Sequence, residues 1–224
     1  MNKVCFINGS PRGKNSASKG LIDKVIEMLD KQKLQSHELS VVEWYRKNIK
    51  EEDFELMSTM NAIVFVFPLY VDAIPSSLLE FMYGFEEYLI KHPCPKNYNV
   101  PKVYSIINNG FIEGKQNMNA LKIMAHYSAR IGFNWRFGIG IGAGEFIRET
   151  MEVIPLKSKL KQSIYECLTI LATDLEGQVN IEQSNIMTNP SMPKFIFTAA
   201  ASRHWVKEAK MSRKALSRRV WSEA

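Results

Sequence analysis

An unbroken run of six apolar residues, 62–67 (Ala-Ile-Val-Phe-Val-Phe), restricts the fold of this chain more than any other feature. A strand with one solvent-exposed face alternates apolar and polar residues, whereas an unbroken apolar run predicts a strand that is buried on both faces. Such strands are typical of parallel sheets with helices on each side. Pro68 ends the run, and an apolar helical pattern follows from Ser76. The segment therefore predicts a strand, a loop and a helix.

The same order of strand and helix recurs along the chain in five repeats. Strands are expected at residues 4–7, 34–42, 62–67, 101–107 and 133–141. Helices are expected at 16–32, from 76 onward, at 117–131 and at 156–175, while 44–60 has only a weak helical pattern. This alternation predicts an α/β fold with one parallel sheet wrapped on both faces. The loops that follow the strands should then meet at the carboxyl edge of the sheet, where such folds bind ligands.

The turn after the first strand has the groups of an anion site. Residues 9–18 read Gly-Ser-Pro-Arg-Gly-Lys-Asn-Ser-Ala-Ser and lead into the first helix. Unpaired N–H groups of the first helical turn, three serine hydroxyls (Ser10, Ser16 and Ser18) and the charge of Arg12 could face one phosphate monoester. The alternative is an ordinary turn in which Ser16 only caps the helix.

Two other phosphate-binding patterns do not fit this loop. The Walker pattern needs Ser or Thr directly after its Lys, but Asn15 follows Lys14. The dinucleotide fingerprint needs a third-position glycine, where Pro11 stands. A second glycine-rich run, 138–145, offers a superficial match to that fingerprint, and we interpret it as small residues at a close packing point or beside a flat ring.

Length and composition suit one α/β domain with appendages. The chain has 224 residues, 46% of them hydrophobic, and no apolar run approaches the roughly 18 residues of a membrane span. The N-terminus opens on a strand pattern without a leader pattern, so we expect a cytoplasmic protein. Cys5, Cys94 and Cys167 are scattered, which argues against a disulfide framework or a metal site.

Three loops, taken in their order along the chain, resemble the flavin-binding loops of the flavodoxin-like NAD(P)H-dependent FMN reductases and quinone reductases. The resemblance extends over roughly residues 1–175. The loops are Gly9-Ser10-Pro11-Arg12 with Ser16 and Ser18, Pro68-Leu69-Tyr70 with Ile74-Pro75, and Asn108-Asn109-Gly110. The resemblance implies a doubly wound five-stranded sheet of order 2-1-3-4-5 with a C-terminal helical extension. It divides the chain into an FMN-binding domain, 1–176, and a connector with a basic helical tail, 177–224.

The resemblance also implies the cofactor and its contacts. FMN is expected, FAD less so, with NAD(P)H as co-substrate, no metal, and no catalytic side chain because hydride passes to flavin N5. The cofactor-binding residues are then Ser10, Arg12, Asn15, Ser16, Ala17, Ser18, Pro68, Leu69, Tyr70, Val71, Asn108, Asn109 and Gly110. Backbone N–H groups in 69–71 and 108–111 are expected to stabilise negative charge on the reduced flavin.

The function that this resemblance implies is the reduction of a small acceptor such as a quinone, a flavin, or a nitro or azo compound. The alternatives are a non-enzymatic electron carrier and a flavin-free binding protein with the same fold. The resembling family commonly completes its sites across a homodimer, so a homodimer is expected.

Four single residues allow a functional and a structural interpretation. Tyr70 would stack on the flavin or only pack, and Asp72 would touch the flavin edge or shape its turn, the turn being preferred. His126 is expected at the surface or in a structural role rather than as a proton donor. Arg136 would meet a nucleotide phosphate or form an ion pair, and the ion pair is preferred.

The net charge of +6 is concentrated in the tail. Residues 194–224 hold eight Lys or Arg and two Glu, which leaves 21 residues of each sign in 1–193. If the tail is helical, a basic stripe forms from Arg203, Lys207, Lys210, Lys214 and Arg218. We expect a solvated face first, with an anionic membrane surface or an acidic partner as the alternatives, and no nucleic-acid partner.

Overall fold

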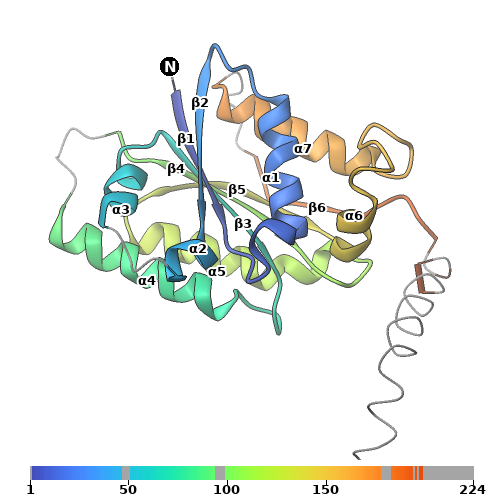
Figure 1. Cartoon of the computed structure of the whole chain (residues 1–224), viewed down its shortest axis with the longest axis horizontal. Coiled ribbons are helices and arrows are strands. Elements are labelled where there is room, and N and C mark those ends of the chain that lie inside the picture. The colour runs from blue at the N-terminus through green and yellow to red at the C-terminus, as the bar shows by residue number, and fades with distance from the viewer. Residues whose placement is uncertain are drawn as a thin grey trace, which may run out of the picture. The chain divides into compact units, whose positions relative to one another are not determined.

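The computed structural model describes residues 2–46, 51–93, 99–177, 183–193, 195 and 197–198. Its centre is a parallel sheet of six strands in the order β2-β1-β3-β4-β5-β6 (Figure 1). The strands are β1 (Asn2–Asn8), β2 (Leu34–Ser40), β3 (Ala62–Pro68), β4 (Lys102–Asn108), β5 (Asn134–Ile141) and β6 (Ile186–Thr188). The predicted α/β class and the order of the first five strands are confirmed.

Helices cover both faces of this sheet (Figure 1). They are α1 (Ala17–Met28), α2 (Val41–Arg46), α3 (Glu51–Ser58), α4 (Ser76–Lys91), α5 (Met118–Arg130), α6 (Gly144–Thr150) and α7 (Gln162–Leu175), with 3-10 turns η1 (Gly13–Asn15) and η2 (Gly114–Asn117). One core joins the sheet to α1, α6 and α7, and the other joins it to α2, α3, α4 and α5. Neighbouring residues of β3 alternate between these cores, which explains its unbroken apolar run.

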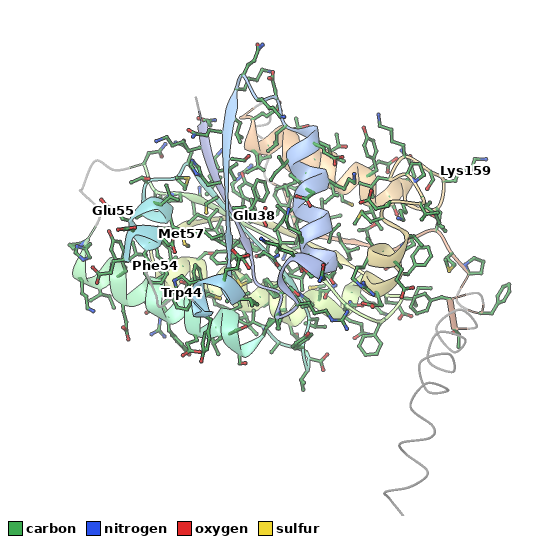
Figure 2. The ribbon with its side chains drawn as sticks, viewed as in Figure 1. Glu38, Trp44, Phe54, Glu55, Met57 and Lys159 are labelled. Atoms are coloured by element: carbon green, nitrogen blue, oxygen red, sulfur yellow. The ribbon has the colours of Figure 1, made fainter. Side chains whose placement is uncertain are left out.

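The second core is rich in aromatic rings. Trp44 of α2 and Phe54 of α3 have ring centroids 5.7 Å apart, and Phe81 of α4 contacts both of them. Met57 belongs to the same core, whereas Lys159 lies exposed in the turns before α7 (Figure 2). This packing holds α2 and α3 in place, although the sequence has only a weak helical pattern there.

Three elements differ from the sequence prediction. The region predicted as a connector, 177–193, contains β6, which pairs with β5 through only three residues and is too short to leave an apolar pattern. Helix α7 begins at Gln162 rather than at 156, because 151–161 forms successive turns around Pro155. The short helix α6 was not predicted. The compact unit containing the sheet accordingly runs from Met1 to Pro190, and Ser191–Ala224 forms a separate unit.

Cys5 and Cys167 are buried free thiols, and burial raises the pKa of Cys5 to about 12. Cys94 and the basic stripe of the tail lie outside the described residues. Within the described part of the chain, no helix has both the length and the apolar character needed to cross a membrane. No cluster of three metal-binding side chains occurs among the same residues.

Candidate functional site

The loops after β1, β3 and β4 surround a cavity of about 130 Å³ at the carboxyl edge of the sheet. The cavity is lined by Ser10, Arg12, Ser16, Ala17, Ser18, Pro68, Leu69, Tyr70, Asn108, Asn109, Gly110 and Glu145. The three loops predicted from the sequence therefore lie together. Of the predicted site residues, Asn15 and Val71 are exposed and do not line this cavity, while Glu145 was not predicted.

Ser16 caps α1. Its hydroxyl accepts a hydrogen bond from the N–H of Lys19 at 3.1 Å and donates one to the carbonyl of Gly13 at 2.6 Å. The proton of this hydroxyl is therefore already used within the loop. Our expectation that all three serines donate to a phosphate is corrected at Ser16, which holds the loop in shape.

The hydroxyls of Ser10 and Ser18 differ from that of Ser16. Ser10 accepts from the N–H of Arg12 at 3.3 Å, and Ser18 accepts from the side-chain amide of Asn108 at 3.1 Å. Among the described residues, neither hydroxyl has an acceptor for its own proton, and the N–H groups of Ala17 and Ser18 also have none. Three donors in the first turn of the 12-residue helix α1 and one in the loop before it, the Ser10 hydroxyl, thus remain available for a phosphate.

Two asparagines join the three loops. The amide of Asn108 donates to Ser18 and also to the carbonyl of Phe67 at 3.2 Å. Asn109 donates to the carbonyl of Glu113 at 3.1 Å, but its side-chain oxygen is buried without a partner in the described structure. A buried oxygen of this kind costs free energy unless a ligand or water donates to it. Asn109 therefore fits a ligand with an N–H or O–H group facing the third loop.

Backbone donors are fewer than we expected in the second and third loops. The N–H groups of Leu69, Tyr70 and Asn109 donate to the carbonyls of Asn108, Ala73 and Ile141, respectively. Our expectation that these three N–H groups stabilise reduced flavin is therefore wrong, because each of them already donates within the protein. In 69–71 and 108–111, the N–H groups of Val71, Gly110 and Phe111 have no acceptor among the described residues.

The turn after β3 is held in an unusual backbone conformation. Tyr70 and Ala73 form an antiparallel bridge, and between them Val71 and Asp72 have φ values of 48° and 57°. Asp72 therefore shapes the turn, in line with our preferred interpretation. Tyr70 is 43% exposed beside the cavity, so it is not an ordinary core side chain.

Val71→Asn is expected to raise the free energy of unfolding by about 1 kcal/mol, because asparagine tolerates the left-handed region and a β-branched residue does not. Val153→Asn is the matched control, since Val153 is also exposed but has ordinary φ. Chemical denaturation measures both changes. Equal effects of the two substitutions would contradict the assignment of strain to Val71.

The glycine-rich run after β5 packs against the third loop. A Cβ on Gly142 would lie 2.0 Å from the carbonyl oxygen of Ile112, and one on Gly144 would lie 2.6 Å from the side-chain oxygen of Asn108. The N–H of Gly144 donates to the carbonyl of Asn109 at 2.6 Å. The interpretation of this run as a close packing point is confirmed, and its contacts bring the start of α6 to the cavity.

Gly142→Ala should lower the free energy of unfolding by about 1–3 kcal/mol, because the new methyl group meets rigid backbone and must displace the third loop. Gly110→Ala in the same loop is the control, since its added methyl group meets nothing within 4 Å. Urea denaturation of both variants tests this. A neutral Gly142→Ala would show that the contact with Ile112 yields easily.

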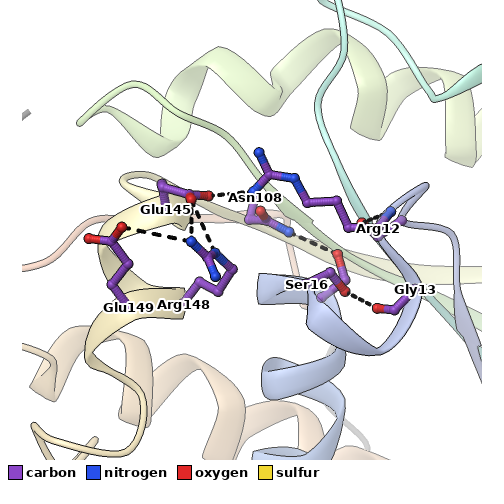
Figure 3. Close-up of polar contacts among 9 residues, drawn as sticks. Arg12, Gly13, Ser16, Asn108, Glu145, Arg148 and Glu149 are labelled. Atoms are coloured by element: carbon purple, nitrogen blue, oxygen red, sulfur yellow. Dashed lines mark hydrogen bonds and ion pairs between the residues drawn. The ribbon is translucent and has the colours of Figure 1, made fainter. Parts of the chain in front are cut away.

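Glu145, which lines the cavity, forms an ion-pair network with Arg12 and Arg148 (Figure 3). One carboxylate oxygen lies 2.9 Å from the guanidinium of Arg12, and the other accepts from Arg148 at 2.5 and 3.1 Å. Arg148 also lies 3.7 Å from Glu149. Burial alone would raise the pKa of Glu145, but the hydrogen bond from Arg148 and the charge of Arg12 outweigh it and lower the pKa. Glu145 is therefore ionised at neutral pH.

The remaining candidate residues lie outside the cavity lining. Arg136 pairs with the buried Asp174 at 2.9 Å, which agrees with the ion-pair interpretation. His126 is exposed on α5. A larger hollow of about 600 Å³ lies between α1, α7 and the turns after α6. Its charged lining is mixed, as in the pairing of Lys24 with Glu27, so it provides no concentrated charge for a phosphate.

The comparisons with known proteins agree with this architecture. Residues 2–82 match the Flavodoxin_2 family, described as the flavodoxin-like fold. The comparison with curated proteins gives no match.

Solved structures with a similar fold cover most of the chain. An oxidoreductase from Corynebacterium diphtheriae has a TM-score of 0.56 and 10% identity, over 80% of this chain and 97% of that one. An NADPH-quinone reductase from P. pentosaceus has a TM-score of 0.52 and 12% identity, over 81% and 99%. A WrbA-like flavodoxin from Agrobacterium tumefaciens has a TM-score of 0.52 and 12% identity, over 79% and 96%. At these identities the likeness concerns the fold. The sheet order and the family match over residues 2–82 together show that this chain has the flavodoxin-like fold.

Proposed function

We propose that this protein binds FMN in the cavity at the carboxyl edge of the sheet and uses NAD(P)H to reduce a small acceptor. The supporting observation is the set of available donors at the first loop: the hydroxyls of Ser10 and Ser18 and the N–H groups of Ala17 and Ser18. These donors suit a phosphate, and the asparagines of the third loop suit a polar ring edge. Bound FMN would supply the redox chemistry.

The chain's own residues would then bind and orient the ligand. Ser10, Ser18 and the first turn of α1 hold the phosphate end. The unpaired oxygen of Asn109 accepts from a ligand donor, while the free N–H groups of Gly110 and Phe111 offer donors to a carbonyl or to developing negative charge. Tyr70 provides an exposed aromatic surface beside the cavity.

The absorption spectrum of the purified protein, with and without added FMN, tests cofactor binding. Anaerobic titration with NADPH and with NADH then separates the possible functions. If the protein is a reductase, at least one of the two nucleotides directly reduces the bound flavin and decreases its absorbance. An electron carrier binds FMN, but neither nucleotide decreases the flavin absorbance. A flavin-free binding protein takes up no FMN.

We further propose a homodimer. Leu79, Tyr83 and Ile90 are exposed on α4, and their spacing of four and seven residues places them near one another along the helix. Light scattering at several protein concentrations measures the mass. A mass of 25.7 kDa at all concentrations would exclude the dimer.

A further inference from the structure

The charges in the cavity lining come from two residues. Arg12 is the one cationic side chain among the described lining residues, and Glu145 is the one anionic side chain. They contact each other at 2.9 Å (Figure 3), and they line the same cavity as Ser10 and Ser18, whose hydroxyls would hold a phosphate. A phosphate that engages Arg12 must therefore share it with an ionised carboxylate, or take it away from that carboxylate.

We propose that Glu145 competes with the ligand's phosphate for Arg12 and thereby sets how strongly the site prefers a phosphorylated flavin over an unphosphorylated one. This inference rests on the proposed function. It assigns Glu145 a specificity-determining role, because a negative charge beside the site opposes binding of a second negative charge.

Arg148 makes an exchange of partners feasible. Glu145 uses one oxygen for Arg12 and the other for Arg148, so it keeps a cationic partner when Arg12 turns to the ligand. The side chains of Arg12 and Glu145 are 58% and 41% exposed. Water can therefore compensate each group during the exchange, and an exposed ion pair of this kind is weak enough to break.

The position of Glu145 is fixed by packing. Gly142 and Gly144 bring the backbone before α6 against Ile112 and Asn108, closer than any other residue type would allow. Glu145 is the next residue, in the first turn of α6. The competing carboxylate is thus held at the cavity by the same contacts that shape the third loop.

Glu145→Gln is the direct test, with Glu149→Gln as its matched control, because Glu149 also lies near Arg148 but does not line the cavity. Fluorescence titration gives dissociation constants for FMN and riboflavin, and calorimetry gives that for inorganic phosphate. Glu145→Gln should tighten FMN about five- to tenfold, the equivalent of roughly 1 kcal/mol. Riboflavin affinity should be unchanged, and Glu149→Gln should change neither ligand.

A second pair of variants tests the exchange itself. Arg148→Met should weaken FMN, since Glu145 would then depend on Arg12 alone. Arg12→Met should weaken FMN more in the Glu145→Gln background than in the wild type, because Arg12 is freed there. Additive effects would overturn the competition, as would equal FMN affinities in Glu145→Gln and Glu149→Gln.

The titration with inorganic phosphate distinguishes failure of the competition from failure of the proposed function. If no variant binds flavin while Glu145→Gln still tightens inorganic phosphate, the proposed function fails and the competition stands. If the wild type binds FMN while Glu145→Gln affects neither FMN nor inorganic phosphate, the competition fails and the proposed function stands. Thermal unfolding of each variant verifies that it is folded.

Discussion

Replacing both Ser10 and Ser18 with alanine is expected to weaken FMN binding about 100-fold or more. Each hydroxyl has a proton without an acceptor in the described structure, and a hydrogen bond to a charged phosphate contributes about 1.5–3 kcal/mol. Two such bonds together correspond to at least about two powers of ten in the dissociation constant. Riboflavin, which lacks the phosphate, should lose little affinity, so fluorescence titration with both ligands measures the effect.

Ser16→Ala is the control that the loop itself provides. The Ser16 hydroxyl caps α1 and donates to Gly13, so this change should lower the free energy of unfolding by about 1 kcal/mol. It should leave the ratio of FMN to riboflavin affinity nearly unchanged. If the Ser10 and Ser18 double variant lost FMN and riboflavin equally, the hydroxyls would hold another part of the ligand or only the loop.

The second large effect concerns stability and arises far from the cavity lining. Asp174 is 3% exposed and accepts from the Tyr104 hydroxyl at 2.8 Å and from two nitrogens of Arg136 at 3.1 and 2.9 Å. Asp174→Ala removes the carboxylate and leaves a largely buried guanidinium and a buried hydroxyl. Such a broken pair costs about 3–5 kcal/mol, and chemical denaturation should show this loss.

Tyr104→Phe separates the two contacts of Asp174. Burial, together with the hydrogen bond to Asp174, raises the pKa of Tyr104, so the hydroxyl stays protonated and acts as a donor. Its removal leaves the pair of Arg136 and Asp174 intact and should cost about 1 kcal/mol. If Asp174→Ala cost no more than Tyr104→Phe, the ion pair would contribute little.

The sequence predicts those features that depend on local pattern. The apolar run 62–67 and the weaker runs at 4–7 and 101–107 predict strands, and the structure places β1, β3 and β4 at the centre of the sheet. Because parallel strands share a carboxyl edge, the pattern also brings the three loops together. The cap at Ser16 follows from residue type at a helix start.

Other features leave no local pattern. Strand β6 is three residues long, and its place in the sheet comes from pairing with β5 rather than from its own composition. The aromatic contacts among Trp44, Phe54 and Phe81 hold α2 and α3 where the helical periodicity is weak. In both places contacts between distant segments decide the structure.

The sequence by itself determined the architecture and the general place of the site, because hydrophobic periodicity and helix-start chemistry act over a few residues. Only the tertiary structure decided which groups in the site are available. In the folded chain the Ser16 hydroxyl donates within the loop, whereas the hydroxyl protons of Ser10 and Ser18 have no acceptor among the described residues. Glu145 contacts Arg12, although the two residues are 133 positions apart in the sequence. Hydrogen bonds and ion pairs depend on distances of about 3 Å between atoms, and packing alone sets such distances.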